Sequence, residues 1–285
     1  MQNNQTTFTE NDIRSFEPAM KIGLLATINA DGLPHLTLIT TLKASSPTGV
    51  VWGQFTEGLS KQNILHNPKT GFLIMSLDKH LWTGKAAYTH AEKSGPDYDF
   101  YNNTPMFRYN AYFGIHTAHY MDLVSHSGES VLPMNRIVFS AVKTMLARRL
   151  VPGHAPLQAL NLWTMAFLQK LDHLKFLSYI DLDGYPQIVP LIQAQAANPG
   201  EVIFCTGAFD EEIQRIPPDA PVALLGMALS MEDVVVRGQY QGLKRRAGLL
   251  CGSVLLDWVY NPMPPAPAQI YPPVPLQVVR DFGFD

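Results

Sequence analysis

Short apolar segments separated by polar turns dominate the first third of the chain. Each segment is long enough for a strand, and several carry β-branched residues. Asp31-Gly32 lies between the first two segments and is a dipeptide typical of hairpin turns. Five strands are expected, at residues 22–28, 36–42, 50–55, 71–77 and 81–88, with a loop at 44–49. This is about the number of strands that a small antiparallel barrel needs.

A polar loop and a short helix are predicted between the third and fourth strands. Ser60 is a candidate N-cap for a helix over residues 61–66, and Asn67-Pro68 ends that helix because proline cannot continue its hydrogen-bond ladder. The N-terminus of the helix then faces Thr56. Free amides, the positive end of the helix dipole, two hydroxyls and the Lys61 ammonium suit a phosphate monoester. Ordinary capping of a surface helix would explain the same residues.

The same pattern recurs in the second half of the chain. Asp31-Gly32-x-Pro34 returns as Asp183-Gly184-x-Pro186, where 183 − 31 = 152, and Tyr88 returns as Tyr240, where 240 − 88 = 152. The apolar segments keep their character under this shift. A period of this length is too long for a solenoid repeat and indicates a duplicated domain.

The two copies differ at the positions that suit a phosphate. Thr56, Ser60 and Lys61 of the first copy correspond to Ala208, Glu212 and Ile213 of the second. The carboxylates of residues 210–212 would repel a phosphate. The second copy is therefore expected to be a degenerate barrel without a cofactor of its own. That it only adds stability remains an open alternative.

Helical periodicity separates the two copies. Residues 136–150 and 157–171 each show helical spacing, and Val151-Pro152-Gly153 interrupts them. They are expected to form a helical connector. A further short helix is expected over residues 10–19. The tail from Asp257 onward contains seven prolines and is expected to run extended along the surface.

A segment between the first copy and the connector is rich in aromatic residues. They are Tyr98, Phe100, Tyr101, Phe107, Tyr109, Tyr112, Phe113 and Tyr120. Such a cluster could wall a substrate pocket, or it could form a strand pair that finishes the barrel, with Phe107 and Tyr109 on one face. His116 and His119 in this segment have no Cys or Glu partner at metal-ligand spacing, so no metal site is expected.

The order of these motifs resembles the pyridoxamine 5'-phosphate oxidase-like family of FMN-binding split barrels. The resemblance rests on Asp31-Gly32-Leu33-Pro34-His35-Leu36-Thr37-Leu38-Ile39, then Thr56-x-x-x-Ser60-Lys61, then Asn67-Pro68. It implies a mainly β protein with helices, built as two tandem split β-barrels joined by a helical connector. The expected domains are residues 1–130 for the cofactor-binding barrel, 131–172 for the connector, and 173–285 for the degenerate barrel with its Pro-rich tail.

The resemblance also implies where FMN would lie. In this family a loop holds the FMN phosphate, and the neighbouring strand lies along the isoalloxazine ring and ribityl chain. The matching phosphate residues are Thr56, Ser60, Lys61 and Gln62, and the matching strand residues are Thr37, Leu38, Ile39, Thr40 and Thr41. The oxidases proper carry arginine and lysine around that strand and an Arg-Lys pair after the serine, where this chain has Thr37, Leu42 and the single cation Lys61. In the related homodimers FMN lies at the subunit interface, so a fused pair is expected to keep one site, walled partly by its second barrel.

Composition and charge narrow the classes of protein to which the chain could belong. The chain has 285 residues, 46% of them hydrophobic, which is ample for a core. A net charge of −3 gives no electrostatic footprint for nucleic acid, and the basic runs 148–149 and 244–246 are interpreted as solvated faces. Two cysteines are too few for a disulfide framework, and no signal peptide or long apolar run is seen. A cytoplasmic protein that binds neither nucleic acid nor membrane is expected.

An FMN-dependent oxidoreductase acting on a small molecule is the leading interpretation. The flavin itself would perform the chemistry, so no side-chain nucleophile is needed and no catalytic residue can be named. The alternatives are a flavin-binding protein without catalysis, and a split barrel that binds haem or a deazaflavin. For haem, His35 or His116 would be the candidate axial ligand. A homodimer in addition to the internal pair is left open.

Overall fold

Two antiparallel sheets form the body of the protein. The computed structural model describes residues 4–105, 108, 114–153, 156–263 and 267–275. The first half contains α1 (Glu10–Phe16), β1 (Lys21–Ile28), β2 (Pro34–Leu38), β3 (Lys43–Ser46), β4 (Gly49–Gln54), α2 (Leu59–His66), β5 (Lys69–Ser76), β6 (His80–Glu92), α3 (Pro96–Asn102), β7 (Thr117–His126) and β8 (Ser130–Val131). The connector contains α4 (Met134–Arg148) and α5 (Leu162–Gln169). The second half contains β9 (Leu174–Ile180), β10 (Pro186–Pro190), β11 (Gln195–Asn198), β12 (Glu201–Cys205), α6 (Asp210–Arg215), β13 (Pro221–Met227), β14 (Asp233–Arg246), β15 (Leu249–Asn261) and β16 (Ala268–Tyr271).

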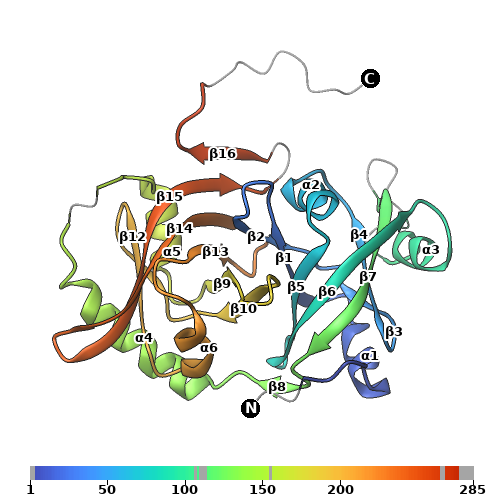
Figure 1. The fold of residues 1–285 in the computed structure, drawn as a ribbon, viewed down its shortest axis with the longest axis horizontal. Coiled ribbons are helices and arrows are strands. Elements are labelled where there is room, and N and C mark those ends of the chain that lie inside the picture. The colour runs from blue at the N-terminus through green and yellow to red at the C-terminus, as the bar shows by residue number, and fades with distance from the viewer. Residues whose placement is uncertain (1–3, 106–107, 109–113, 154–155, 264–266, 276–285) are drawn as a thin grey trace.

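The two sheets have the same strand order. The first runs β2-β1-β5-β6-β7-β4-β3, and the second runs β10-β9-β13-β14-β15-β12-β11. In addition, β8 pairs with β6 and β16 pairs with β15. Figure 1 shows the sheets side by side, the first in blue to green and the second in yellow to red. The predicted fold, mainly β with two tandem split barrels, is confirmed.

Hydrogen bonds outside the strand ladders repeat with the strands. The Ile39 N–H donates to the Gly23 carbonyl at 2.7 Å, and the Leu191 N–H donates to the Lys175 carbonyl at 2.9 Å. The donor and the acceptor of this hydrogen bond are each displaced by 152 residues between the two repeats, since 191 − 39 = 152 and 175 − 23 = 152. The predicted duplication therefore extends to local backbone geometry.

Some predicted element boundaries were wrong. The strand predicted over 36–42 ends at Leu38, because the chain then turns through residues 39–42, with the Leu42 N–H donating to the Ile39 carbonyl at 3.2 Å. The predicted loop at 44–49 overlaps β3, an edge strand whose serines are exposed. The first helix ends at Phe16 instead of residue 19.

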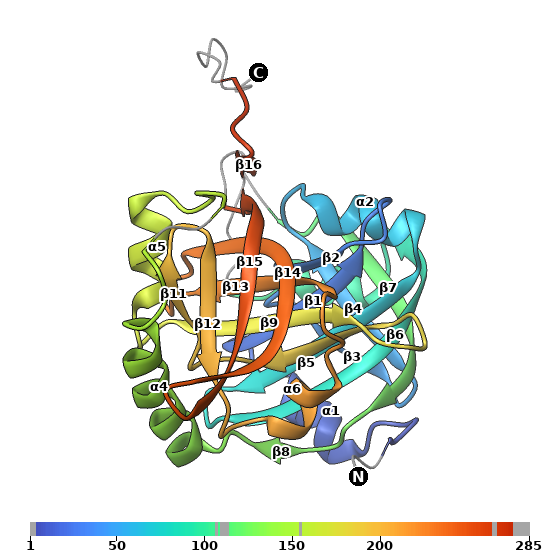
Figure 2. The ribbon, with the colours of Figure 1, turned by 60° about the vertical axis from the view of Figure 1, so that its left-hand side comes forward.

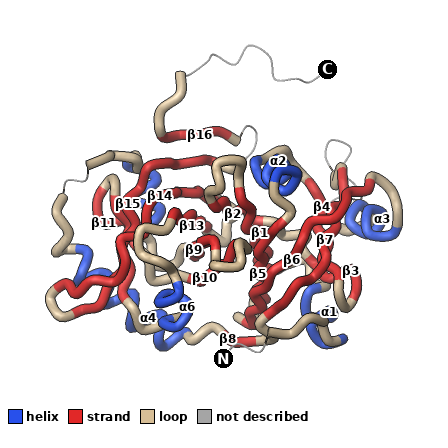
Figure 3. The backbone as a smooth tube through the Cα atoms, in the orientation of Figure 1, coloured by secondary structure: helices blue, strands red, loops and turns tan. Residues whose placement is uncertain are grey.

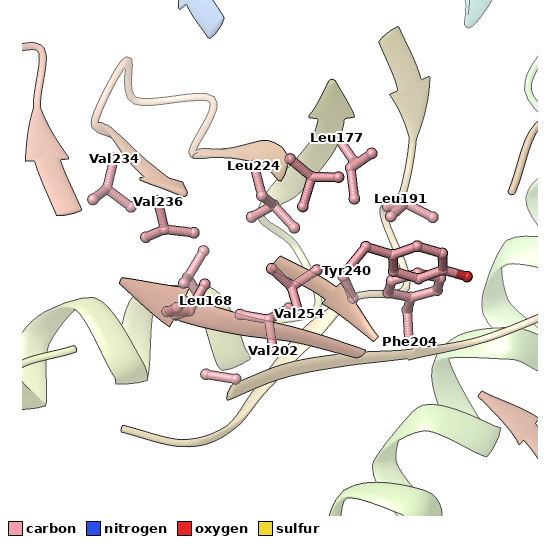
Figure 4. Close-up of a cluster of buried hydrophobic side chains, with 14 of the residues drawn as sticks. Leu168, Leu177, Leu191, Val202, Phe204, Leu224, Val234, Val236, Tyr240 and Val254 are labelled. Atoms are coloured by element: carbon pink, nitrogen blue, oxygen red, sulfur yellow. The ribbon is translucent and has the colours of Figure 1, made fainter. Parts of the chain in front are cut away.

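Each barrel encloses its own core. In the second, the rings of Phe204 and Tyr240 stack with centroids 6.1 Å apart, and Figure 4 shows them among aliphatic side chains from several strands. In the first, Leu25, Trp52 and Phe72 are fully buried. The two cores share no residue, although Phe167 and Leu168 of the connector also pack into the second, so each barrel has a core of its own.

A third apolar layer joins the two barrels. Strands β1, β2 and β5 of the first face β9, β10 and β13 of the second. Its buried side chains come from both halves and include Leu24, Leu36, Leu73, Phe176, Ile188 and Leu225. Gly71 lies where the backbones are closest, because a Cβ there would come 2.1 Å from the Pro186 carbonyl oxygen. The junction is therefore a close-packed interface inside one chain.

The helices lie around the sheets (Figure 3). Helix α4 contacts β11, β12 and β15, and α5 contacts β11, so the connector covers one side of the second barrel (Figure 2). On the other barrel, the Tyr101 hydroxyl of α3 donates to the carbonyls of Thr41 and Val51 at 2.9 and 3.2 Å. The strand pair predicted around Phe107 and Tyr109 lies outside the described residues. Among the helices that are described, none combines the length and apolar character of a membrane span.

We expect Gly71→Ala to destabilise the protein by about 1–3 kcal/mol, because the new methyl group overpacks a rigid backbone contact. Gly153→Ala is the matched control, since nothing lies within 4 Å of a Cβ at that position. Urea unfolding monitored by tryptophan fluorescence measures both variants. Equal effects of the two substitutions would contradict the close approach of the barrels.

Candidate functional site

The loop between β4 and α2 gathers polar side chains at the barrel junction. The Lys61 ammonium turns back and donates to the Thr56 carbonyl. Helix α2 is held against β1 by Asn63, whose amide donates to the Thr27 hydroxyl at 3.0 Å. Gly58 is the N-cap and supplies no side-chain cap. The first amides of α2 therefore have no capping side chain.

The prediction that Ser60 is the N-cap was wrong. The helix already begins at Leu59, so Ser60 lies in its first turn. Its buried hydroxyl instead forms a hydrogen bond with the Thr37 hydroxyl of β2. This contact joins the strand and the helix that the sequence assigned to one site.

The other predicted site residues differ in their burial and in their hydrogen-bond partners. Thr56, Leu38 and Thr40 are half-buried beside the junction, and Gln62 is exposed. The Ile39 side chain packs into the core of the first barrel. The Thr41 hydroxyl bonds both the N–H and the carbonyl of Gly53 at 3.0 Å. Among the described residues, hydrogen bonds join the predicted site residues in two separate pairs, Thr37 with Ser60 and Lys61 with Thr56.

The second barrel supplies a wall that sequence reasoning missed. Trp258 and Tyr260 of β15 stack with centroids 5.2 Å apart, and both rings meet the buried His35 ring edge-on, at 6.2 and 5.7 Å. The Arg237 guanidinium lies over the Trp258 ring at 4.3 Å. These residues have no local motif, because they come from the other repeat.

Two cations, Lys61 and Arg237, act on the buried histidines near the junction. Burial, followed by the charges of Arg237 and Lys61, lowers the pKa of His35 to about 3. Burial and the Lys61 charge lower the pKa of His119 to about 4. Both imidazoles are therefore neutral at pH 7, while Lys61 and Arg237 carry the positive charge. Burial also lowers the pKa of Lys61, and Glu57 opposes that shift.

A hydrogen-bonded chain fixes the start of the loop. The His119 ring stacks on Trp52 at 4.1 Å and bonds the Gln54 amide oxygen at 3.0 Å. The Gln54 amide nitrogen then donates to Glu57 at 3.0 Å. His116 bonds Thr117 at 2.8 Å instead. Within the described ranges, no three metal-ligating side chains converge.

These residues fit a phosphate monoester. The hydroxyls of Thr37 and Ser60, the Lys61 ammonium and the amides at the start of α2 are all donors. Lys61 has no ion pair in the part of the chain that the structure describes. In the buried environment of the junction, an anion would complete this set of donors.

The equivalent loop of the second repeat does not fit a phosphate. Ala208 and Ile213 are fully buried in apolar clusters. Asp210 accepts from the Gly207 N–H at 2.6 Å and pairs with Arg136 of α4 at 3.2 Å. The Asp210 carboxylate, held by Arg136 of the connector, thus lies in the loop where the first repeat has its candidate phosphate site.

Comparison with known proteins gives similarity in structure only. No family model and no curated protein matches the sequence. An FMN-binding protein from Syntrophomonas wolfei has 13% identity and a TM-score of 0.36, over 41% of this chain and 82% of its own. A candidate pyridoxamine 5'-phosphate oxidase from Lactobacillus delbrueckii has 17% identity and a TM-score of 0.35, over 44% and 98%. A protein described as an F420 reductase has 15% identity and a TM-score of 0.33, over 42% and 98%. Each match spans about the length of one barrel.

We expect His35→Gln to make the protein less sensitive to mild acid. The folded pKa of His35 lies near 3, below the unfolded value of 6.5, so its contribution to stability is present above pH 6.5 and is lost as the pH falls. Between pH 7 and pH 5 the wild-type protein should lose about 2 kcal/mol through this group. Gln is the residue that the second repeat carries at this position, as Gln187.

Urea unfolding of both proteins at pH 7 and pH 5 measures this difference. The test compares the change in the free energy of unfolding with pH, so a constant effect of the substitution cancels. An identical change in the two proteins would rule out His35 as the buried neutral group.

Proposed function

We propose that the first barrel binds one FMN and that the protein is an FMN-dependent oxidoreductase acting on a small molecule. The proposed phosphate residues are Thr56, Ser60, Lys61 and Gln62, and the flavin would lie along Thr37, Leu38, Ile39, Thr40 and Thr41. One observation carries the proposal. The Thr37 and Ser60 hydroxyls meet at the start of α2, the helix whose first turn also carries Lys61.

The chain's own residues have distinct parts in this proposal. Thr37 and Ser60 would donate to phosphate oxygens, and Lys61, which has no ion pair among the described residues, would supply positive charge. The Gln54–Glu57 hydrogen bond orients the loop that precedes α2. Trp258 and Tyr260 exclude water from the second-barrel side of the junction. Bound FMN supplies the hydride- or electron-transfer chemistry.

His35 would act as a neutral polar group beside the flavin. Its Nδ1 atom is buried and has no hydrogen-bond partner among the described residues. Because its pKa is lowered to about 3, the ring offers one donor and one acceptor at pH 7. A side chain with that capacity suits a ligand with both kinds of polar edge.

We expect each chain to bind one FMN, because only the first repeat combines hydroxyls with a cation at the phosphate position. The visible spectrum of purified protein should show the double band of a flavin and no Soret band. Flavin released by heat and counted against protein gives the ratio. Two flavins per chain would show that the second repeat is not degenerate.

We expect Lys61→Ala to weaken FMN binding roughly ten- to hundredfold, since a charge-assisted hydrogen bond contributes on the order of 1.5–3 kcal/mol. Riboflavin lacks the phosphate, so its affinity should change little. Glu212→Ala, at the equivalent of Ser60 in the second repeat, is the matched control and should leave FMN binding intact.

Fluorescence quenching titrations measure these affinities. If Lys61→Ala weakened riboflavin as much as FMN, Lys61 would not be a phosphate ligand. The assignment of the loop would then have to be abandoned.

A further inference from the structure

A cavity of about 500 Å³ lies on the opposite side of the junction from the proposed FMN site. Its walls are residues 187–190 from β10, residues 209–212 from the start of α6, and Leu81 from the first barrel. A second cavity of about 290 Å³ adjoins it. The two share the lining residues Thr83, Ser127, Tyr179, Gln187 and Arg215. This volume is typical of a small-molecule site.

The cavity lies in the second repeat at the position that the proposed FMN site has in the first. Strand β10 replaces β2 and α6 replaces α2, and the wall now comes from the first barrel. In the first sheet Lys85 pairs with Ser125, and in the second Arg237 pairs with Trp258, where 237 − 85 = 152. Trp258 is therefore the counterpart of Ser125.

The same correspondence holds two residues further along the strand. The Ser127 N–H donates to the Thr83 carbonyl at 2.8 Å, and Tyr260 pairs with Val235, where 235 − 83 = 152. Tyr260 is therefore the counterpart of Ser127. Two aromatic rings form the wall of the first site, and two serines stand at the same positions in the second.

One charge in the cavity lacks a partner. Arg136 pairs with Asp210 at 3.2 Å, and Arg215 pairs with Glu211 at 3.9 Å. Glu212 is half-buried and has no ion pair among the residues described. It stands where the first repeat has Ser60, since 212 − 60 = 152. The site therefore carries an unpaired carboxylate next to an apolar floor.

We propose that this cavity binds an organic cation, a protonated amine on an apolar body. The Glu212 carboxylate pairs with the ammonium group, and the side chains of Leu81 and Ile188, which belong to the same apolar layer at the junction, pack against the body. Gln187 also lines the cavity, and its Nε2 atom has no hydrogen-bond partner among the described residues. Phosphate esters are disfavoured, because residues 210–212 are all carboxylates. The proposal does not depend on FMN binding at the first site.

Two probes of the same shape test the role of charge. Phenethylammonium carries the cation, and 2-phenylethanol replaces it with a hydroxyl. Isothermal titration of the full chain should show the amine binding about tenfold more tightly than the alcohol. Glu212→Gln should reduce the amine to the affinity of the alcohol and leave the alcohol unchanged. Glu17→Gln removes the same charge at an exposed position far along the chain and should change neither affinity.

A second variant tests the location. Ser127→Tyr introduces the residue that the first site carries at this position, so it should abolish binding of both probes. Circular dichroism and the melting temperature show whether Ser127→Tyr is folded. If this variant does not fold, the comparison of Glu212→Gln with the wild-type protein still tests the proposal. The proposal is overturned if neither probe binds at millimolar concentration, if the alcohol binds as tightly as the amine, if Glu212→Gln leaves the amine affinity unchanged, or if a folded Ser127→Tyr still binds.

Discussion

The close packing of the two barrels along β1, β2 and β5 against β9, β10 and β13 is the constraint on which the rest depends. It brings backbone so near to backbone that Gly71 leaves no room for a methyl group beside Pro186. Because each functional position combines a loop from one repeat with a wall from the other, neither barrel alone would form either site. The junction thus acts as a dimer interface fixed within one chain.

The two sides of this junction have the same order of strands but different side chains. On one side, β2 carries Thr37, which bonds Ser60, and His35, whose ring meets Trp258 and Tyr260. On the other, the loop is anchored to α4 by Arg136, and serines leave a cavity. Once duplication had fused the copies, each side could change without altering its counterpart. We propose that one side is suited to an anion and the other to a cation.

Local signals in the sequence predicted much of this arrangement. The shift of the Asp-Gly turn from residue 31 to residue 183 indicated the duplication, and the loop from Thr56 to Lys61 was found from hydroxyls near a helix start. Arg237, Trp258 and Tyr260 could not be found, because they reach the site across the junction from a repeat that lies far along the chain. β3 was missed because its exposed serines are typical of a loop, and the cavity was missed because it depends on the small size of Ser125 and Ser127.

A crystal structure of the protein grown with FMN tests the central claim, that the fused pair holds one phosphate-binding site, most directly. We expect phosphate density beside Ser60 and Lys61, with the flavin next to the second barrel's Trp258, and no phosphate density at residues 208–213. Phosphate density at residues 208–213, or a flavin bound away from the junction, would contradict it.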